Sequence, residues 1–102
     1  MSKYIFTKQH KGTAFYFDDY EDLIHFYVAI IKFAYDNGMD YSNDAVVAHA
    51  FHKALSNNDL TNDEKEVLYD EFDETIYWIN DSTEPPLAIY DKGDCYIIDD
   101  WT

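Results

Sequence analysis

Residues 61–80 read TNDEKEVLYDEFDETIYWIN, and this stretch decides most of the predicted fold. It opens with Thr61 and Glu64 in the Thr-x-x-Glu form of a capping box, which marks the start of a helix. Apolar side chains then recur at intervals of three and four residues, so they share one side of that helix. These residues are Leu68, Phe72, Ile76 and Ile79. The pattern predicts a helix that ends near Asn80 and packs one face into a hydrophobic core.

The opposite face of this predicted helix is anionic. It carries Asp63, Glu66, Asp70, Asp73, Glu74 and Asp81, with Glu64 and Glu71 on its flank. These eight carboxylates lie along about 28 Å of helix, which gives roughly one negative charge every 3.5 Å. This spacing is close to the ~3.4 Å between phosphates along one DNA strand. Like charges one turn apart destabilise a helix, and Lys65 is the only lysine between Asp59 and Glu84. A partner that supplies cations would relieve the repulsion, whereas an ordinary solvated face is the simpler alternative.

The whole chain is strongly acidic. Its 102 residues include 7 lysines and no arginine against 21 acidic side chains, for a formal net charge of −14. A surface of this sign repels phosphates, so direct binding of nucleic acid or of an anionic membrane is not expected. With 47% hydrophobic and 19% aromatic residues, the composition indicates one folded domain over residues 1–102 and not a disordered acidic tail.

Outward from the central helix, the two ends of the chain predict β-hairpins. Residues 3–8 and 13–18 are aromatic and β-branched runs on either side of Gly12, and residues 87–90 and 95–98 flank a turn at Gly93. The expected fold class is therefore α+β, in the order β-β-α-α-α-β-β. Two β-hairpins form one antiparallel sheet, and three central helices pack on one face of it.

Two further helices are predicted between the hairpins. The first should begin near Asp18 or Asp19 and end at Asn37-Gly38. Its apolar surface covers more than half of its circumference, which predicts a central buried helix and would also suit a homodimer interface. The second helix should be capped by Ser42 or Asn43 and bury one side. That side holds Val46, Val47, Ala50, Phe51, Ala54 and Leu55.

A second acidic group follows the central helix along the chain. It consists of Asp91, Asp94, Asp99 and Asp100, next to Trp101. No helix terminus explains these carboxylates, so they are expected to extend the anionic surface around an aromatic contact.

Few residues suggest catalysis or metal binding. Cys95 follows Asp94, and nearby carboxylates suppress the thiolate, so a small packing residue is expected. His49 and His52 share a helix face, but no further ligand lies one turn away on that helix, and surface histidines are expected instead of a zinc site. The sequence predicts no catalytic residue, metal ligand or cofactor. A small enzyme stays an alternative, because nothing selects two of the 21 acids as a catalytic pair.

The sequence also bears on location. Residues 1–13 lack the apolar core of a signal peptide, and the longest apolar run, residues 26–31, is too short to cross a bilayer. The one cysteine of the chain is consistent with a reducing compartment. A cytoplasmic protein is expected.

In charge pattern, carried by Asp63 to Asp81 and Asp91 to Asp100, the chain resembles the DNA-mimic inhibitors. These are small acidic proteins, often phage-encoded, that occupy the nucleic-acid-binding clefts of restriction enzymes, CRISPR effectors or other DNA-binding proteins. The resemblance implies an anti-restriction or anti-CRISPR inhibitor that is not an enzyme and whose partner is a cationic nucleic-acid-binding protein. The partner-binding residues would be Asp63, Glu66, Asp70, Asp73, Glu74, Asp81, Asp91, Asp94, Asp99, Asp100 and Trp101.

A second hypothesis uses the same carboxylates. Small acidic α+β domains also suit an immunity protein or antitoxin that neutralises a basic nuclease toxin. A DNA mimic should compete with DNA of unrelated sequence for its target, whereas an immunity protein should recognise one cognate toxin.

Overall fold

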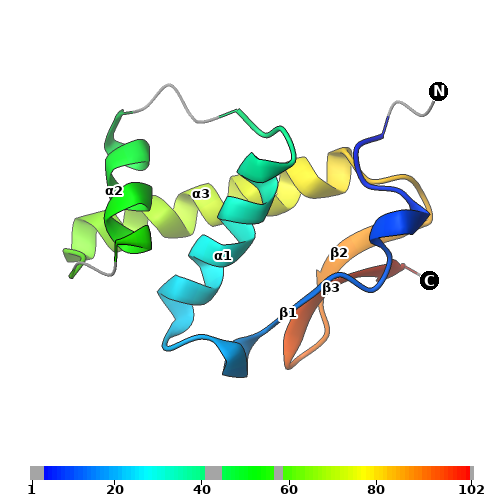
Figure 1. The fold of residues 1–102 in the computed structure, drawn as a ribbon, viewed down its shortest axis with the longest axis horizontal. Helices are drawn as coiled ribbons and strands as arrows, with labels where there is room; N and C mark the ends of the chain where they lie inside the picture. The colour runs from blue at the N-terminus through cyan, green and yellow to red at the C-terminus, as the bar shows by residue number, and fades with distance from the viewer. Residues whose placement is uncertain (1–3, 41–44, 57–58, 102) are drawn as a thin grey trace.

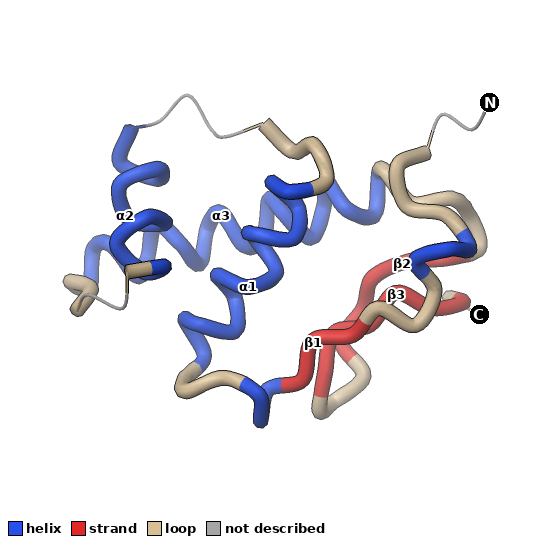
Figure 2. The backbone as a smooth tube through the Cα atoms, in the orientation of Figure 1, coloured by secondary structure: helices blue, strands red, loops and turns tan. Residues whose placement is uncertain are grey.

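The computed structural model describes residues 4–40, 45–56 and 59–101 (Figure 1). Within this part of the chain, the fold is α+β, with helices and an antiparallel sheet side by side (Figure 2). The elements in chain order are the 3₁₀ turn η1 (Lys8–His10), strand β1 (Ala14–Tyr16), the 3₁₀ turn η2 (Phe17–Asp19), helices α1 (Leu23–Asp36), α2 (Ala45–Leu55) and α3 (Asn62–Asp81), and strands β2 (Leu87–Asp91) and β3 (Cys95–Asp100).

The described sheet has three strands in the order β1-β3-β2, and both pairs are antiparallel. Strands β2 and β3 form the predicted C-terminal hairpin, in a register that runs from Leu87 opposite Asp100 to Asp91 opposite Tyr96. Gly93 takes a φ of +104° in the turn, a conformation that glycine adopts without strain. The α+β class is confirmed, but the described residues form three strands of the sheet and not the four that the sequence predicts.

The predicted N-terminal hairpin is wrong. Its first residue, Lys3, lies outside the described residues, and the segment after it runs beside the end of α3 instead of pairing with β1. The backbone N–H groups of Ile5 and Phe6 each donate to the carbonyl of Ser82 at 3.0 Å, and Phe6 forms a single parallel bridge with Thr83.

Burial of one aromatic ring explains this departure. Phe6 is fully buried, with its ring 5.4 Å from that of Phe33 and 5.8 Å from that of Trp78. Next to it, the turn η1 closes when Thr7 N–H donates to His10 Nδ1 at 3.2 Å and His10 N–H donates to the Thr7 carbonyl at 2.8 Å. The segment before η1 therefore lies along the end of α3 and does not pair with β1. Burial of Phe6 in the core outweighs the local hairpin pattern.

Helix α1 is the buried helix that the sequence predicts, although it starts later than expected. Asp18 and Asp19 lie in η2, and the N-cap is Asp22, whose Oδ1 accepts the His25 N–H at 3.0 Å. The helix ends at Asn37-Gly38 as predicted. Its buried residues are Ile24, Phe26, Val28, Ile30, Ile31 and Ala34.

Helix α2 buries a narrower arc than predicted. Val47, Ala50, Phe51 and Ala54 are buried. Val46 and Leu55 are instead 56% and 43% exposed, because they lie at the two edges of that arc. The predicted caps, Ser42 and Asn43, lie outside the described residues.

Helix α3 begins at the predicted capping box. Thr61 Oγ1 accepts the Glu64 N–H at 3.2 Å, and Glu64 Oε1 accepts the Thr61 N–H at 2.8 Å. The buried face of α3 consists of Leu68, Phe72, Thr75 and Ile79. This face packs on α1, where Phe72 stacks on Tyr27 with 3.9 Å between ring centroids.

The sheet packs against α1 and α3 through one face. Tyr96 of β3 contacts Phe26 of α1 and Phe72 of α3, with ring centroids 5.8 and 5.4 Å apart. At the edge of β2, Asn80 Oδ1 accepts the Ile89 N–H at 2.8 Å, which ties the end of α3 to the strand. Among the helices of the described residues, none combines the length and the apolar character that a membrane span requires.

Candidate partner-binding surface

The exposed side of α3 carries the acids that the sequence predicts for it. We call these residues the α3 acidic face: Asp63, Glu66, Asp70, Asp73, Glu74 and Asp81, each of which is exposed. The buried residues of the helix lie on its opposite side. The predicted orientation of α3 is therefore confirmed, while its role in binding stays a prediction.

Across the described residues, no member of the α3 acidic face forms an ion pair with a lysine or histidine. The two acids on the flank behave differently. Glu64 lies 2.8 Å from Lys53 Nζ of α2, and Glu71 accepts a hydrogen bond from the Tyr35 hydroxyl of α1. The flanking acids therefore stabilise the fold. Without them, six exposed carboxylates remain along the helix, spaced at roughly 4.5 Å, which is wider than the spacing that the sequence suggests for eight.

The hydrogen bonds at Glu64 change its acidity. Those from Lys53 Nζ and from the Thr61 N–H lower the pKa of the Glu64 carboxyl from 4.5 to about 2. Both bonds favour the charged form. Glu64 is consequently ionised throughout the neutral range and fixes the start of α3 against α2.

Tyr77 lies within the α3 acidic face and was missed by the sequence reasoning. It is 77% exposed, the highest value among the large hydrophobic side chains of the described chain. Its position four residues after Asp73 and four before Asp81 places it on the same side of the helix as both. That spacing was the available signal, because an aromatic at an acidic helix position cannot be a core residue.

Two hollows border this face. The first is about 450 Å³ and lies between α2 and α3, lined by Val47, Val67, Asp70, Glu71, Asp73 and Glu74. The second is about 340 Å³, lined by Met39, Asp40, Glu71, Glu74 and Trp78. Both combine carboxylates with apolar walls. Such a surface suits lysine or arginine side chains, whose aliphatic stems pack on apolar atoms while their charged ends meet carboxylates.

The C-terminal acids divide into two groups. Burial raises the pKa of Tyr27 and of Tyr96, and the charges of Asp73 and Asp91 raise both pKa values further. Asp91 therefore lies near the same two tyrosines as Asp73 of α3. Asp94 is exposed in the turn of the hairpin.

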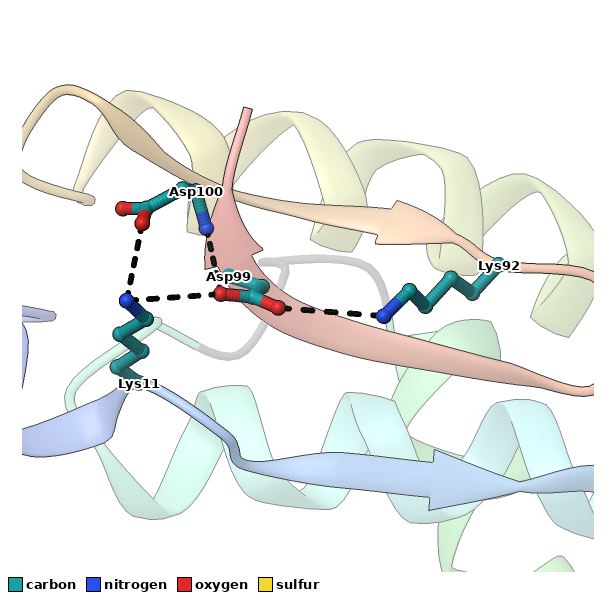
Figure 3. A network of polar contacts seen from close by, with 4 residues as sticks. All are labelled: Lys11, Lys92, Asp99 and Asp100. Atoms are coloured by element: carbon teal, nitrogen blue, oxygen red, sulfur yellow. Dashed lines mark hydrogen bonds and ion pairs between the residues drawn. The ribbon is translucent and has the colours of Figure 1, made fainter. Parts of the chain in front are cut away.

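Asp99 and Asp100 lie at the other end of the hairpin and have local cations (Figure 3). Lys11 Nζ lies 2.9 Å from Asp100 and 3.9 Å from Asp99, and Lys92 Nζ lies 4.0 Å from Asp99. The hydrogen bond to Asp100 raises the pKa of Lys11. Nearby lysines therefore largely balance the charge of these two acids, unlike the charge of the α3 acidic face. Trp101 is 65% exposed beside them.

The neighbours of His49 and Cys95 bear on metal binding and on thiol reactivity. His49 Nε2 of α2 lies 3.6 Å from Glu64 of α3. The spacing of residues within α2 could not predict this contact, because the carboxylate belongs to another helix. Within the described residues, no group of three or more His, Cys, Asp or Glu side chains is placed to hold a metal ion. Cys95 is 3% exposed, and its burial and the neighbouring Asp94 raise the pKa of the thiol.

Comparison of this chain with protein-family models, with curated proteins and with solved structures finds no match.

Proposed function

We propose that this protein is an acidic DNA mimic that occupies the nucleic-acid-binding cleft of a cationic protein and thereby inhibits it. The observation that carries this proposal is the α3 acidic face: six exposed carboxylates without a lysine partner in the described residues, along one side of a 20-residue helix. The inhibition is competitive and involves no catalysis. The target is a restriction enzyme, a CRISPR effector or a similar DNA-binding protein. The protein binds this target in the cytoplasm.

Electrostatics supports this assignment. A groove lined with lysine and arginine recognises a row of negative charges, and in duplex DNA these charges recur every ~3.4 Å along a strand. The α3 acidic face offers roughly one charge per 4.5 Å, which is the same order of density. With a net charge of −14, the long-range field steers the protein toward a positive cleft and makes binding depend on salt.

Tyr77 adds an aromatic contact to the charge pairing. An arginine of the target can stack on the exposed ring of Tyr77, which is worth about 0.5–1 kcal/mol at an exposed site. The neighbouring carboxylates of Asp73 and Asp81 then accept hydrogen bonds from the same guanidinium. This combination of an aromatic ring and flanking acids forms the centre of the proposed interface.

A capture experiment tests the proposal. The immobilised protein is incubated with bacterial lysate at low and high salt, and the retained proteins are identified and challenged with duplex DNA of unrelated sequence. We expect a DNA-binding protein that salt and DNA both displace. Retention of one nuclease toxin that DNA does not displace would support the immunity-protein hypothesis instead.

Two double variants locate the binding surface. Asp70→Lys with Asp73→Lys reverses the centre of the α3 acidic face and should abolish capture. Asp18→Lys with Asp19→Lys makes the same change in net charge at exposed positions of η2 and should retain it. Equal losses in both variants would mean that overall charge, and not α3, is responsible for binding.

A further inference from the structure

The N-terminal strap, as we call residues 4–10, is attached to the rest of the fold on both sides of the turn η1. Before the turn, Phe6 N–H donates to the Ser82 carbonyl at 3.0 Å. After the turn, Gly12 N–H donates to the Ile98 carbonyl of β3 at 2.8 Å. In Figure 1 the strap is drawn in dark blue and runs beside the end of α3. The course of the chain between the two attachments depends on η1.

A histidine closes this turn. Thr7 N–H donates to His10 Nδ1 at 3.2 Å. His10 is the third residue of η1, where a capping box normally carries Glu or Gln as the acceptor for the N–H of the capping residue. Nδ1 can accept a hydrogen bond only through a lone pair, so the imidazole that closes the turn is neutral and carries its proton on Nε2.

The ring of His10 also packs on the buried part of the strap. It meets the ring of Phe6 edge to face, with 5.2 Å between centroids and 82° between planes. Phe6 is fully buried and contacts the rings of Phe33 and Trp78. Because these rings form one continuous cluster, displacement of the imidazole disturbs the seat of Phe6 in the core.

Protonation of His10 removes the hydrogen bond that closes the turn. Nδ1 then carries a hydrogen and becomes a donor, so the Thr7 N–H faces a second N–H group. His10 takes part in no ion pair within the described residues that would offset this loss. Lys11 is held by Asp100 instead. The charged side chains of the strap and of the neighbouring elements are Lys8, Lys11, Lys32, Asp36, Asp81, Glu84, Asp99 and Asp100.

We infer that His10 is a pH-sensitive latch on the N-terminal strap: the neutral imidazole holds the strap in place, and the protonated imidazole releases it. Histidine is the side chain that ordinarily changes charge between about pH 5 and pH 8. The attached strap requires the neutral form. It is therefore fixed above this range of pH and loosens as the pH falls through it.

Release of the strap would reach the candidate binding surface. Trp78 lies 5.8 Å from Phe6, and it also lines the hollow of about 340 Å³ that borders the α3 acidic face. Loss of Phe6 from its seat removes a neighbour of Trp78, so mild acid changes the wall of that hollow. The latch does not depend on the proposed function, because its state is measured on the protein alone.

Amide hydrogen exchange, followed by NMR at about pH 7.5 and about pH 5.5, tests the latch. After correction for the intrinsic pH dependence of exchange, protection of the Ile5 and Phe6 amides should fall at least about fivefold at the lower pH. This is the effect of losing one ordinary hydrogen bond. Protection of Leu68 in α3 should not fall, because the strap opens locally. An equal fall at Leu68 would indicate global unfolding and would overturn the inference.

Substitutions of His10 separate its hydrogen bond from charge changes elsewhere. His10→Gln keeps a neutral acceptor at the same position and should hold the strap at both pH values. His10→Lys places a permanent charge and no acceptor there, and it should leave the strap weakly protected at both. His49→Gln removes an exposed histidine from α2 and should respond to pH like the wild type. Strap protection that is independent of pH in the wild type, or a pH dependence that persists in His10→Gln, would overturn the inference.

Discussion

Lys53 of α2 and Glu64 of α3 form an ion pair of 2.8 Å, and the same carboxylate oxygen accepts the N–H of Thr61 at 2.8 Å. One side chain thus caps a helix and joins it to its neighbour. The pair is the main direct polar link between α2 and the start of α3 in the described chain. Protonation of Glu64 at low pH would break it.

The first prediction concerns acid stability. Because the pKa of Glu64 falls from 4.5 to about 2 on folding, its contribution is fully present above pH 4.5 and is lost as the pH falls toward 2. Glu64→Gln should lower the melting temperature at neutral pH and flatten the loss of stability across that acid window. Thermal melts at a series of pH values measure this. Glu66→Gln, which changes an exposed acid without an ion pair in the described residues, is the control and should preserve the wild-type slope.

The second prediction concerns the contact between α1 and α3. Phe72 is 4% exposed and stacks on Tyr27, so Phe72→Ala should reduce the free energy of unfolding by about 3–5 kcal/mol. Urea denaturation gives the value. Tyr77→Ala, on the exposed side of the same helix, should change it little. Similar effects for the two substitutions would contradict the orientation of α3.

The third prediction separates stability from binding. Asp70 lies within one turn of Glu66, Asp73 and Glu74, so Asp70→Lys replaces repulsion by attraction and should stabilise the protein. Each like-charged pair removed contributes about 0.2–0.5 kcal/mol. The gain should shrink as salt is added, since these charges are exposed. A variant that is more stable yet no longer captures a target would indicate that the acids are retained for binding; a variant that is less stable would show that they support the helix.

The fourth prediction tests the N-terminal segment. Phe6 is fully buried whereas its neighbour Ile5 is 41% exposed. Phe6→Ala should therefore destabilise the fold by about 3–5 kcal/mol, and Ile5→Ala by far less. Guanidinium unfolding of both variants provides the comparison. If residues 3–8 formed a strand of the predicted hairpin, both substitutions would have modest effects.

The parts of the fold that local chemistry determines could be predicted from the sequence. The capping box at Thr61 and the apolar spacing from Leu68 to Ile79 act within a single helix, and the Gly93 turn acts within a single hairpin. The N-terminal segment could not be predicted in this way. Its strand-like pattern is local, but its position depends on Ser82, which is distant in the chain.

The candidate site shows the same division. Residues of the α3 acidic face could be predicted because they share one helix, and their exposure follows from its phase. The pairing of Glu71 with Tyr35, and of Asp99 with Lys11, joins separate elements. Sequence spacing therefore overestimated the number of unpaired carboxylates in both acidic groups, because it could not reveal which of them accept hydrogen bonds or form ion pairs with other elements.

The strand order β1-β3-β2 has a consequence for how the protein is made. The central strand, β3, is the last of the described strands in the chain, and both β1 and β2 pair only with it. During synthesis, β1 cannot pair until residues 95–97 have been made, which happens after all three described helices. The helices can form early from local contacts, whereas the sheet closes in a late, non-local step. Until then the apolar strands are exposed, and this interval is when the chain is most prone to aggregate.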